Sequence, residues 1–520
     1  MDSRMLSEIY HEETKYHENQ MRKFQRQLDW NVQPAPYKEY ATEKKVDLLP
    51  YLPFHHNPLN GEPLASRDTE AEEPFGLNEI SRLLYFTHGV TAVLQYTSGQ
   101  TLHMRAAPTA GGLYPTEIYL AARGLSALSD GIYNFLAKEH ALVPAWEGNF
   151  WGAFERYCLD QEAIGQSHLL LVLTAVYQRS AWRYQERAYR RILLDTGHIL
   201  GNLALYAPKE GFVPCPIGGF VDTSLNRLLF LEEAAEGALA VVALPRRDQV
   251  DPAEIPWRAP AASRRRAQAG QHAMLHLELH RASSILPEES AVAAPMPIAA
   301  DPLDRSRHAD ADDVVILPEV ASDLSDEIEQ TILRRRSARA FTGDPFFVDE
   351  LAAILNFAYL SDLSSSPAFF APALLETYLI VQKVIGLPAG AYRLAPRGAL
   401  QNPLQGAPNR MRLTRLMSGD FRPQTQHFCL GQALARDAAV VVVHVAHLKV
   451  ALARYGDRAY RYLHLDAGHI GQRLNLAAVH RGLGASGIGG FYDDEVNGLL
   501  GLSLDHIVVY VTTLGRPQGE

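Results

Sequence analysis

Residues 183–199 read RYQERAYRRILLDTGHI, and residues 454–470 read RYGDRAYRYLHLDAGHI. The second stretch repeats the first at an offset of 271 positions and keeps most of its charged and aromatic residues. Self-similarity of this kind is typical of an internal duplication. Apolar residues recur around both stretches at a spacing near 3.6, so we expect each copy to contribute one long, mostly buried helix.

Further matches extend the repeat in both directions. Residues 216–220 (PIGGF) match residues 487–491 (GIGGF) at the same offset. Between these anchors the offset falls to 259, which indicates compensating insertions of twelve residues. The chain therefore contains two copies of one fold, which we expect to pack as an intramolecular pseudo-dimer.

The domain boundaries follow from the extent of the repeat. We expect a first domain with an N-terminal extension at residues 1–245 and a second domain at residues 321–520. Residues 246–320 are rich in proline, alanine and arginine and largely lack apolar periodicity, which predicts a linker.

Periodicity also predicts the main elements of both domains. Helices are expected at residues 78–89, 189–210 and 461–481, and strands at residues 116–122, 168–176, 438–445 and 507–513. Helices beside a mostly antiparallel sheet give the α+β class.

Composition narrows the class of protein. The 520 residues are 47% hydrophobic and carry a net charge of −10, which argues against a disordered chain and against a nucleic-acid partner. No apolar run approaches the roughly 20 residues of a membrane span. Three cysteines cannot form a disulfide framework, and they show no metal-binding spacing, so we expect a cytoplasmic protein without a metal site.

An arginine-rich segment opens the second copy. Residues 334–341 read RRRSARAF, and Arg335, Arg336, Ser337 and Arg339 supply the guanidinium and hydroxyl donors that suit a phosphate monoester. Basic runs at helix ends also arise simply to complement the helix dipole. In the first copy Leu64 and Asp68 stand in place of Arg335 and Arg339, which predicts that this copy cannot hold a phosphate.

A glycine-containing loop shows the opposite loss. The first copy contains Pro108, Thr109, Ala110, Gly111 and Gly112, whose small side chains and exposed amides let a planar ligand approach the backbone. The second copy has bulk in place of both glycines, in PAFFAPA at residues 367–373. Because each copy keeps what the other lost, we expect one composite site per chain.

The third element is the loop with Ile488, Gly489 and Gly490. It follows a long helix, whereas the dinucleotide fingerprint follows a strand and opens a helix, so we do not assign it to NAD. Its backbone can still face a flat ring. Asp195 with His198, and Asp466 with His469, lie on one helical face in each copy, and we interpret them as buried structural pairs.

As a set, these segments resemble the nitroreductase superfamily and, within it, the SagB/ThcOx-type dehydrogenases. The resemblance covers nearly the whole chain outside the predicted linker, and residues 11–15 (HEETK) resemble that family's N-terminal extension. In the superfamily, two copies of an α+β fold form an intimate dimer with FMN at the interface. The resemblance therefore implies an FMN cofactor between the two domains of this chain.

The resemblance also implies roles for individual residues. The FMN phosphate and ribityl chain would be bound by Arg335, Arg336, Ser337 and Arg339. Arg516 would be a further basic residue on the phosphate side. Ile488, Gly489 and Gly490 would lie along the isoalloxazine. The remaining contacts come from the other domain, through Pro108, Thr109, Ala110, Gly111 and Gly112.

Azoline-oxidising members of the family have a Lys-Tyr pair that handles the substrate proton. The matching positions here are Arg183 with Tyr184 and Arg454 with Tyr455, and an arginine is a poor general base. Tyr184, Tyr455 and Arg454 are the catalytic candidates, although each tyrosine also suits simple packing at a helix start.

We expect an FMN-dependent oxidoreductase that transfers hydride between flavin and a small organic or peptide-derived substrate, as in azoline-type or other tailoring oxidations. The alternatives are an NAD(P)H-dependent nitro or quinone reductase, and a non-catalytic flavin-binding or scaffold protein. Further assembly into a homo-oligomer stays open.

Overall fold

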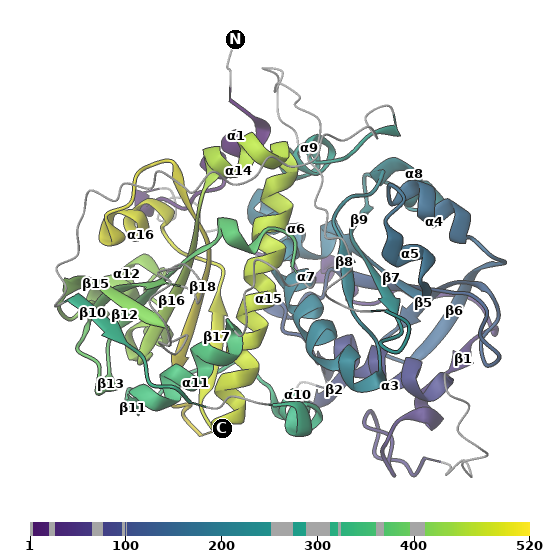
Figure 1. Ribbon diagram of the computed structural model, residues 1–520, viewed down its shortest axis with the longest axis horizontal. Helices are drawn as coiled ribbons and strands as arrows, with labels where there is room; N and C mark the ends of the chain where they lie inside the picture. The colour runs from purple at the N-terminus through teal and green to yellow at the C-terminus, as the bar shows by residue number, and fades with distance from the viewer. Residues whose placement is uncertain are drawn as a thin grey trace.

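The computed structural model describes residues 4–19, 27–64, 76–95, 99, 101–250, 274–287, 313–320, 324–359, 369–395 and 411–519. Over these ranges the chain forms two α+β halves that lie side by side, with the long helices α7 (Ala188–Tyr206) and α15 (Ala459–His480) between their sheets (Figure 1). The tandem α+β fold expected from the repeat is confirmed.

Each half contains a seven-stranded antiparallel sheet with an equivalent strand order. The first order is β1-β6-β5-β4-β7-β9-β8 and the second is β10-β15-β14-β12-β16-β18-β17. The first sheet comprises β1 (Val46–Asp47), β4 (Thr116–Ala122), β5 (Gly131–Leu136), β6 (Ala141–Glu147), β7 (Ser167–Val176), β8 (Cys215–Ile217) and β9 (Glu236–Pro245). The second comprises β10 (Val314–Ile316), β12 (Glu376–Val381), β14 (Gly390–Ala395), β15 (Arg412–Ser418), β16 (Val440–His447), β17 (Gly484–Ile488) and β18 (His506–Gly515). Two small sheets pair β2 (Val90–Gln95) with β3 (Thr101–Arg105), and β11 (Phe346–Phe347) with β13 (Val384–Ile385).

The helices cover these sheets. Those of the first half are α3 (Leu77–His88), α4 (Trp151–Tyr157), α5 (Glu162–Gly165), α6 (Tyr177–Tyr184), α7 and α8 (Asp222–Leu228). Those of the second half are α10 (Ile328–Arg334), α11 (Val348–Ala358), α12 (Arg422–Phe428), α13 (Ala433–Asp437), α14 (Leu448–Tyr455), α15 and α16 (Asp493–Leu500). Two further short helices are α1 (Leu6–Glu13) and α9 (Leu275–Ala282).

The predicted elements are confirmed to within a few residues. The four expected strands are β4, β7, β16 and β18, and the three expected helices are α3, α7 and α15. The largest difference lies after Tyr206, where α7 gives way to a short 3-10 turn at Ala207–Glu210.

The two halves meet where α7 crosses α15. A Cβ atom built on Gly197 would lie 2.2 Å from the carbonyl oxygen of Leu465 and 2.8 Å from the Cα of Gly468. A Cβ on Gly468 would lie 2.2 Å from the carbonyl oxygen of Leu194. Only glycine lets the two backbones approach this closely, which explains the glycine in both LDTGHI and LDAGHI.

The prediction of a linker over residues 246–320 is wrong for two described stretches. β10 is an edge strand of the second sheet, paired with β15. α9 is held by its apolar residues, since Leu275, Leu277 and Leu279 are buried in the main core. The eight-residue length of α9 hides this periodicity among the surrounding proline and alanine.

α9 makes the contact with α15 that α1 makes with α7. The carbonyl of His11 in α1 accepts a 2.7 Å hydrogen bond from Nη2 of Arg190, and the carbonyl of His280 in α9 accepts one of 2.7 Å from Nη2 of Arg461. Since Arg461 is the repeat equivalent of Arg190, the duplicated unit includes the N-terminal helix.

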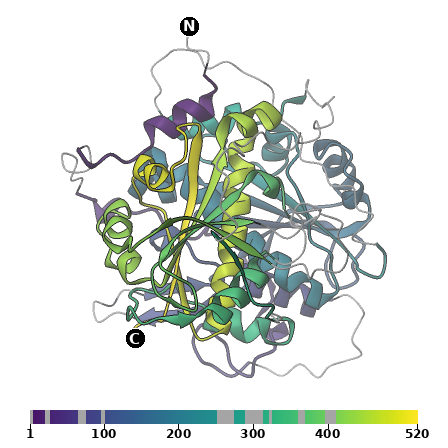
Figure 2. The same cartoon turned by 60° about the vertical axis from the view of Figure 1, so that its left-hand side comes forward.

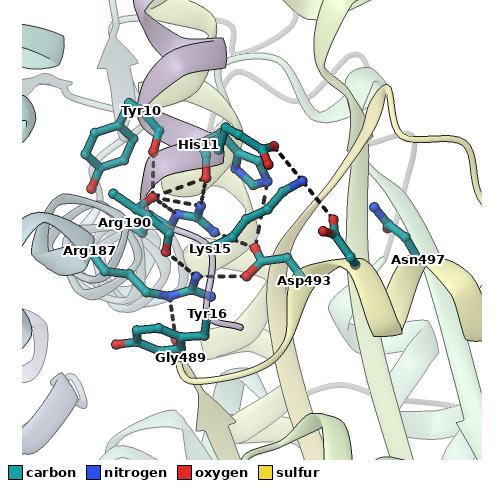
Figure 3. Close-up of polar contacts among 12 residues, drawn as sticks. Tyr10, His11, Lys15, Tyr16, Arg187, Arg190, Gly489, Asp493 and Asn497 are labelled. Carbon is teal, nitrogen blue, oxygen red and sulfur yellow. Dashed lines mark hydrogen bonds and ion pairs between the residues drawn. The ribbon is translucent and has the colours of Figure 1, made fainter. Parts of the chain in front are cut away.

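Two equivalent buried charge clusters join the halves. Asp493, at the start of α16, accepts hydrogen bonds from Arg190 of α7 (2.6 Å) and from Arg187 in the turn before α7 (2.8 Å), as Figure 3 shows. In the other cluster Asp222 accepts from Arg458 (2.8 Å) and Arg461 (2.6 Å). Each cluster ties one half's long helix to the other half's sheet edge.

The N-terminal segment completes the Asp493 cluster. α1 lies against the second half, beside α14 and close to α16 (Figure 2), and the amide of Ser7 donates to Asp457. The hydroxyl of Thr14 accepts from Arg190 (2.8 Å), and the carbonyl of Thr14 accepts from Arg187 (2.7 Å). The first residues of the chain therefore satisfy guanidinium donors at the interface.

Replacing the buried carboxylate should destabilise the protein strongly. We expect Asp493→Ala to lower the free energy of unfolding by about 3–5 kcal/mol, because it leaves Arg187 and Arg190 buried without a counter-charge. Asp494→Ala, which removes the adjacent and more exposed partner of Lys15, should cost about 0–1 kcal/mol. Guanidinium denaturation of the two variants tests this, and equal losses would contradict the account.

Candidate functional site

The arginine-rich segment of the second half reaches the first half directly before its glycine loop. Nε of Arg335 donates to the carbonyl of Ala106 (2.8 Å), and Nη2 donates to the carbonyl of Arg105 (3.3 Å). The amide of Ala338 donates to the carbonyl of Ala485 in β17 (2.9 Å). Residues 335–341 thus lie between the glycine loop of one half and the strand that leads into Gly489 of the other.

The four predicted phosphate-side residues of this segment differ in exposure. Arg335 is 2% exposed, and its Nη1 is buried with no hydrogen-bond partner among the described residues. Arg336 donates to the carbonyls of Arg335 (2.6 Å) and Thr91 (3.2 Å). Ser337 is half-buried and Arg339 is exposed. Burial lowers the pKa of Arg335 to about 10, so its guanidinium stays charged at neutral pH.

Arg516 lies beside this segment, but its side chain is engaged elsewhere. Its carbonyl accepts from the amide of Thr342 (3.0 Å). Its guanidinium donates to the carbonyl of Pro345 (2.9 Å) and pairs with Glu350 (3.3 Å) at the start of α11. The backbone of Arg516 is therefore near the predicted site, while its charge is shared with Glu350.

The glycine loop is held by a carboxylate. Asp195 accepts hydrogen bonds from the hydroxyl of Thr109 (2.6 Å) and the amide of Ala110 (3.1 Å). Gly111 and Gly112 have φ of 70° and 72°, which favours glycine at both positions. A Cβ on Gly111 would also lie 2.7 Å from the hydroxyl of Tyr184. The expectation of a structural role for Asp195 agrees with these contacts.

The equivalent loop of the second half carries aromatic rings. Asp466 accepts from the amides of Phe370 (2.9 Å) and Ala371 (2.6 Å), in the manner of Asp195. The Phe370 ring stacks on Tyr462, and a Cβ on Gly218 would lie 2.9 Å from Phe370. Since Gly218 is the repeat equivalent of Gly489, aromatic side chains fill the second half's version of the site. Asp68, expected to repel phosphate there, lies outside the described residues.

Tyr184 links the glycine loop to the Gly489 loop. The guanidinium carbon of Arg191 lies 3.8 Å from the centroid of the Tyr184 ring. Nη1 of Arg191 in turn donates to the carbonyl of Gly489 (3.2 Å). Tyr184, Arg191 and Gly489 therefore form a continuous chain of contacts across the interface between the two halves. Burial raises the pKa of the Tyr184 phenol above its usual value, so it is protonated at neutral pH.

The other two catalytic candidates lie at the aromatic-filled position. Tyr455 is buried with its ring 5.4 Å from that of Tyr462, and the Arg454 guanidinium lies 5.1 Å from the Tyr455 ring centroid. The structure thus brings Tyr184 together with the glycine loop and with Gly489, and it places Tyr455 and Arg454 in the other copy's site.

Two residues at the composite position were missed in the sequence. Arg191 is the repeat equivalent of Tyr462, and comparison of the two copies would have shown a charged residue in only one of them. Tyr16 follows α1, and its ring lies 3.8 Å from the position of a Cβ built on Gly490. No sequence pattern indicated that the N-terminal segment reaches this loop.

Among the described residues, no group of three or more His, Cys, Asp or Glu side chains is arranged to hold a metal ion. No helix in the same residues is long and apolar enough to cross a membrane.

Asp195 should make stability depend on pH. Burial raises its pKa to about 7, above the value near 4 expected in the unfolded chain, so the native state binds the proton more tightly. Its contribution is present below about pH 4 and is lost as pH rises to about 7, by roughly 1.4 kcal/mol per unit. Asp195→Asn should reduce the slope of the unfolding free energy between pH 4 and 7. It should not abolish that slope, because burial also raises the pKa of the equivalent Asp466 to about 7. An unchanged slope would contradict the assignment.

Known proteins resemble the chain over both halves. The Nitroreductase family matches residues 77–244 and 332–516. A crystal structure of a nitroreductase from Anabaena variabilis is 37% identical and superposes with a TM-score of 0.84, covering 99% of this chain and 100% of that one.

Two curated proteins match part of the chain. The nitroreductase MJ1384 of Methanocaldococcus jannaschii is 29% identical over 178 residues, which are 34% of this chain and 84% of that protein. The microcin B17-processing protein McbC of Escherichia coli is 25% identical over 142 residues, which are 26% of this chain and 52% of McbC. The chain belongs to the nitroreductase family, as a tandem of two such domains, and is an oxidoreductase of that type.

Proposed function

We propose that the protein is an FMN-dependent oxidoreductase with one composite site per chain. One observation carries the proposal. The arginine-rich segment of the second half contacts the first half just before the glycine loop, at Ala106, while Phe370 fills the equivalent place in the other copy. At the composite position Arg191, and not an aromatic ring, faces Gly489. A duplicated fold whose two glycine positions face such different side chains fits a single cofactor.

The residues present fit FMN. A phosphate would accept hydrogen bonds from the unpartnered Nη1 of Arg335, and from Arg336, Ser337 and Arg339 beside it. A flat ring along Ile488, Gly489 and Gly490 would lie against Arg191 and Leu430, whose side chains approach to within 3.1 Å and 2.9 Å of a Cβ built on Gly489 and on Gly490. Pro108, Thr109, Ala110, Gly111 and Gly112 would close the site from the other half. Arg516 would lie beside the phosphate side through its backbone, with its guanidinium paired to Glu350.

A bound FMN would supply hydride transfer at its reactive nitrogen and pass the electrons to O2 or another acceptor. The chain's own residues orient the reactants and control protons. The protonated phenol of Tyr184 lies between the glycine loop and the Gly489 loop, where it can donate a proton to a substrate. Arg183, in place of a lysine, stays charged and does not act as a base.

The substrate class follows from this chemistry and from the relatives. We infer a small organic or peptide-derived substrate whose oxidation or reduction involves a hydride and a proton. Oxidation in a natural-product pathway, of the azoline type or another tailoring type, is the first candidate, and the processing role in the name of McbC supports it. Reduction of nitro or quinone compounds with NAD(P)H is the second, since the family's name describes nitro reduction.

Charge reversal at Arg339 should release the cofactor. Arg339→Glu places a carboxylate beside the proposed phosphate, and losing a charge-assisted contact costs about 1.5–3 kcal/mol, or roughly 10- to 100-fold in FMN affinity. Arg334→Glu, five positions earlier and also exposed, is the matched control and should keep its flavin. Equal FMN retention by the two variants, measured by absorbance after gel filtration, would exclude the phosphate assignment.

Turnover separates an enzyme from a flavin-binding scaffold. FMN-loaded protein should be reduced anaerobically by a substrate or by NAD(P)H and should reoxidise in air over repeated cycles. Rapid reduction by NAD(P)H favours the nitro or quinone reductase, and slow reduction favours oxidation of an organic substrate. A protein that binds FMN and undergoes neither reaction would be the non-catalytic alternative.

A further inference from the structure

Arg191 is a buried cation with no ion-pair partner among the described residues of the composite site. Asp195 is close enough to interact with its charge, but that carboxylate is bound to the glycine loop. The side chain of Arg191 comes from the middle of α7 and is 6% exposed. Among the described residues no carboxylate forms an ion pair with its guanidinium, and its Nε is buried with no hydrogen-bond partner. Burying a guanidinium in this way is costly unless a ligand compensates for it.

Nearby acids are already used. Asp493 accepts from Arg190, which shares α7 with Arg191, and from Arg187 in the turn before α7. Asp195, one turn after Arg191, is bound to the glycine loop, and burial raises its pKa to about 7, so it is only partly charged at neutral pH. The corner between α6 and α7 therefore keeps a surplus of positive charge.

The surplus runs from solvent to the Gly489 loop. Arg183 is exposed, and its guanidinium carbon lies 5.6 Å from the centroid of the Tyr184 ring. Arg191 is buried and lies 3.8 Å from the same centroid. One exposed and one buried cation therefore lie near the same ring, and positive charge arranged in this way raises the local concentration of anions.

The repeat argues that this cation serves a ligand and not the fold. The second half keeps Arg454 at the position of Arg183 but has Tyr462 at the position of Arg191. Tyr462 packs well there against Tyr455 and Phe370. Because an aromatic ring satisfies the packing, the arginine is retained only in the copy with the glycine loop.

The free edge of the guanidinium matches a carboxylate. Nη1 donates to the carbonyl of Gly489 (3.2 Å), and Nη2 makes only a long 3.5 Å contact with the hydroxyl of Tyr16. Nε and Nη2 form the edge that pairs with a carboxylate through two parallel hydrogen bonds. Tyr16, held by the N-terminal segment beside Gly490, lies where it can add a third donor.

We propose that Arg191 binds a carboxylate of the substrate and restricts the enzyme to organic anions, with Arg183 at the entrance. The proposal rests on the proposed function, since it names the substrate class of the same site. Arg191 is a specificity-determining residue in this account, distinct from the phosphate-side arginines at residues 335–339.

Two isosteric probes test it. Isothermal titration calorimetry of FMN-loaded protein with 4-nitrobenzoate and 4-nitrobenzamide should show the benzoate binding tighter by roughly tenfold or more. Arg191→Gln should bring the ratio near one, and Arg191→Lys should restore part of it. Arg227→Gln, an exposed change on α8 with the same loss of charge, should keep the wild-type ratio. Arg183→Gln should weaken benzoate binding mainly at low salt.

The outcomes separate this proposal from the cofactor assignment. Equal affinity of wild type for the two probes, or an unchanged ratio in Arg191→Gln, would overturn it. Loss of FMN from Arg191→Gln would also overturn it, since Arg191 would then hold the flavin. If wild type takes up no FMN, the proposed function fails, while the probe ratio measured on the flavin-free protein still decides the role of Arg191. If Arg191→Gln does not fold, the Arg191→Lys and Arg183→Gln ratios decide.

Discussion

The close approach of α7 and α15 at Gly197 and Gly468 is the contact on which the rest of the structure depends. Two backbones meet there with no room for a Cβ atom on either glycine. The contact fixes the distance between the two sheets, and thereby whether a segment of one half can touch a loop of the other. Arg335 reaches the carbonyl of Ala106 across this interface, so a site made from both halves requires the crossing.

The charge clusters of Asp493 and Asp222 keep the pairing symmetric while the sites diverge. Each cluster buries one carboxylate with two arginines and is completed by a short helix, α1 or α9. This shared framework carries the stability of the interface. The loops at the two sites therefore do not have to stabilise the interface. One copy could fill its site with Phe370 while the other kept its glycines.

Sequence comparison within the chain predicted much of this arrangement. The repeat gave the two domains, the main strands and helices, and the three segments that meet between the halves. The comparison was informative because both copies keep the same residue types at glycine, buried polar and helix-forming positions. The opposite losses at Leu64 and Phe370 predicted a single composite site before any contact was known.

The missed features depend on three-dimensional packing. α9 matches α1 at an offset of 269 and not 271, and eight residues inside a proline-rich stretch show little periodicity. Arg516 lies at the predicted place, but the direction of its side chain is set by Glu350, which no local pattern reveals. In the sequence Arg191 is one of several arginines at the start of the helix. Only the position of Gly489 in the structure distinguishes it from the others.

The number of flavins per chain tests the central claim most directly. Purified protein, saturated with FMN and freed of excess cofactor, should contain one FMN per chain, quantified by absorbance and identified by mass after release. Two per chain would contradict the closure of the second site by Phe370 and its neighbours. None would contradict the proposal that the two halves together form a flavin site.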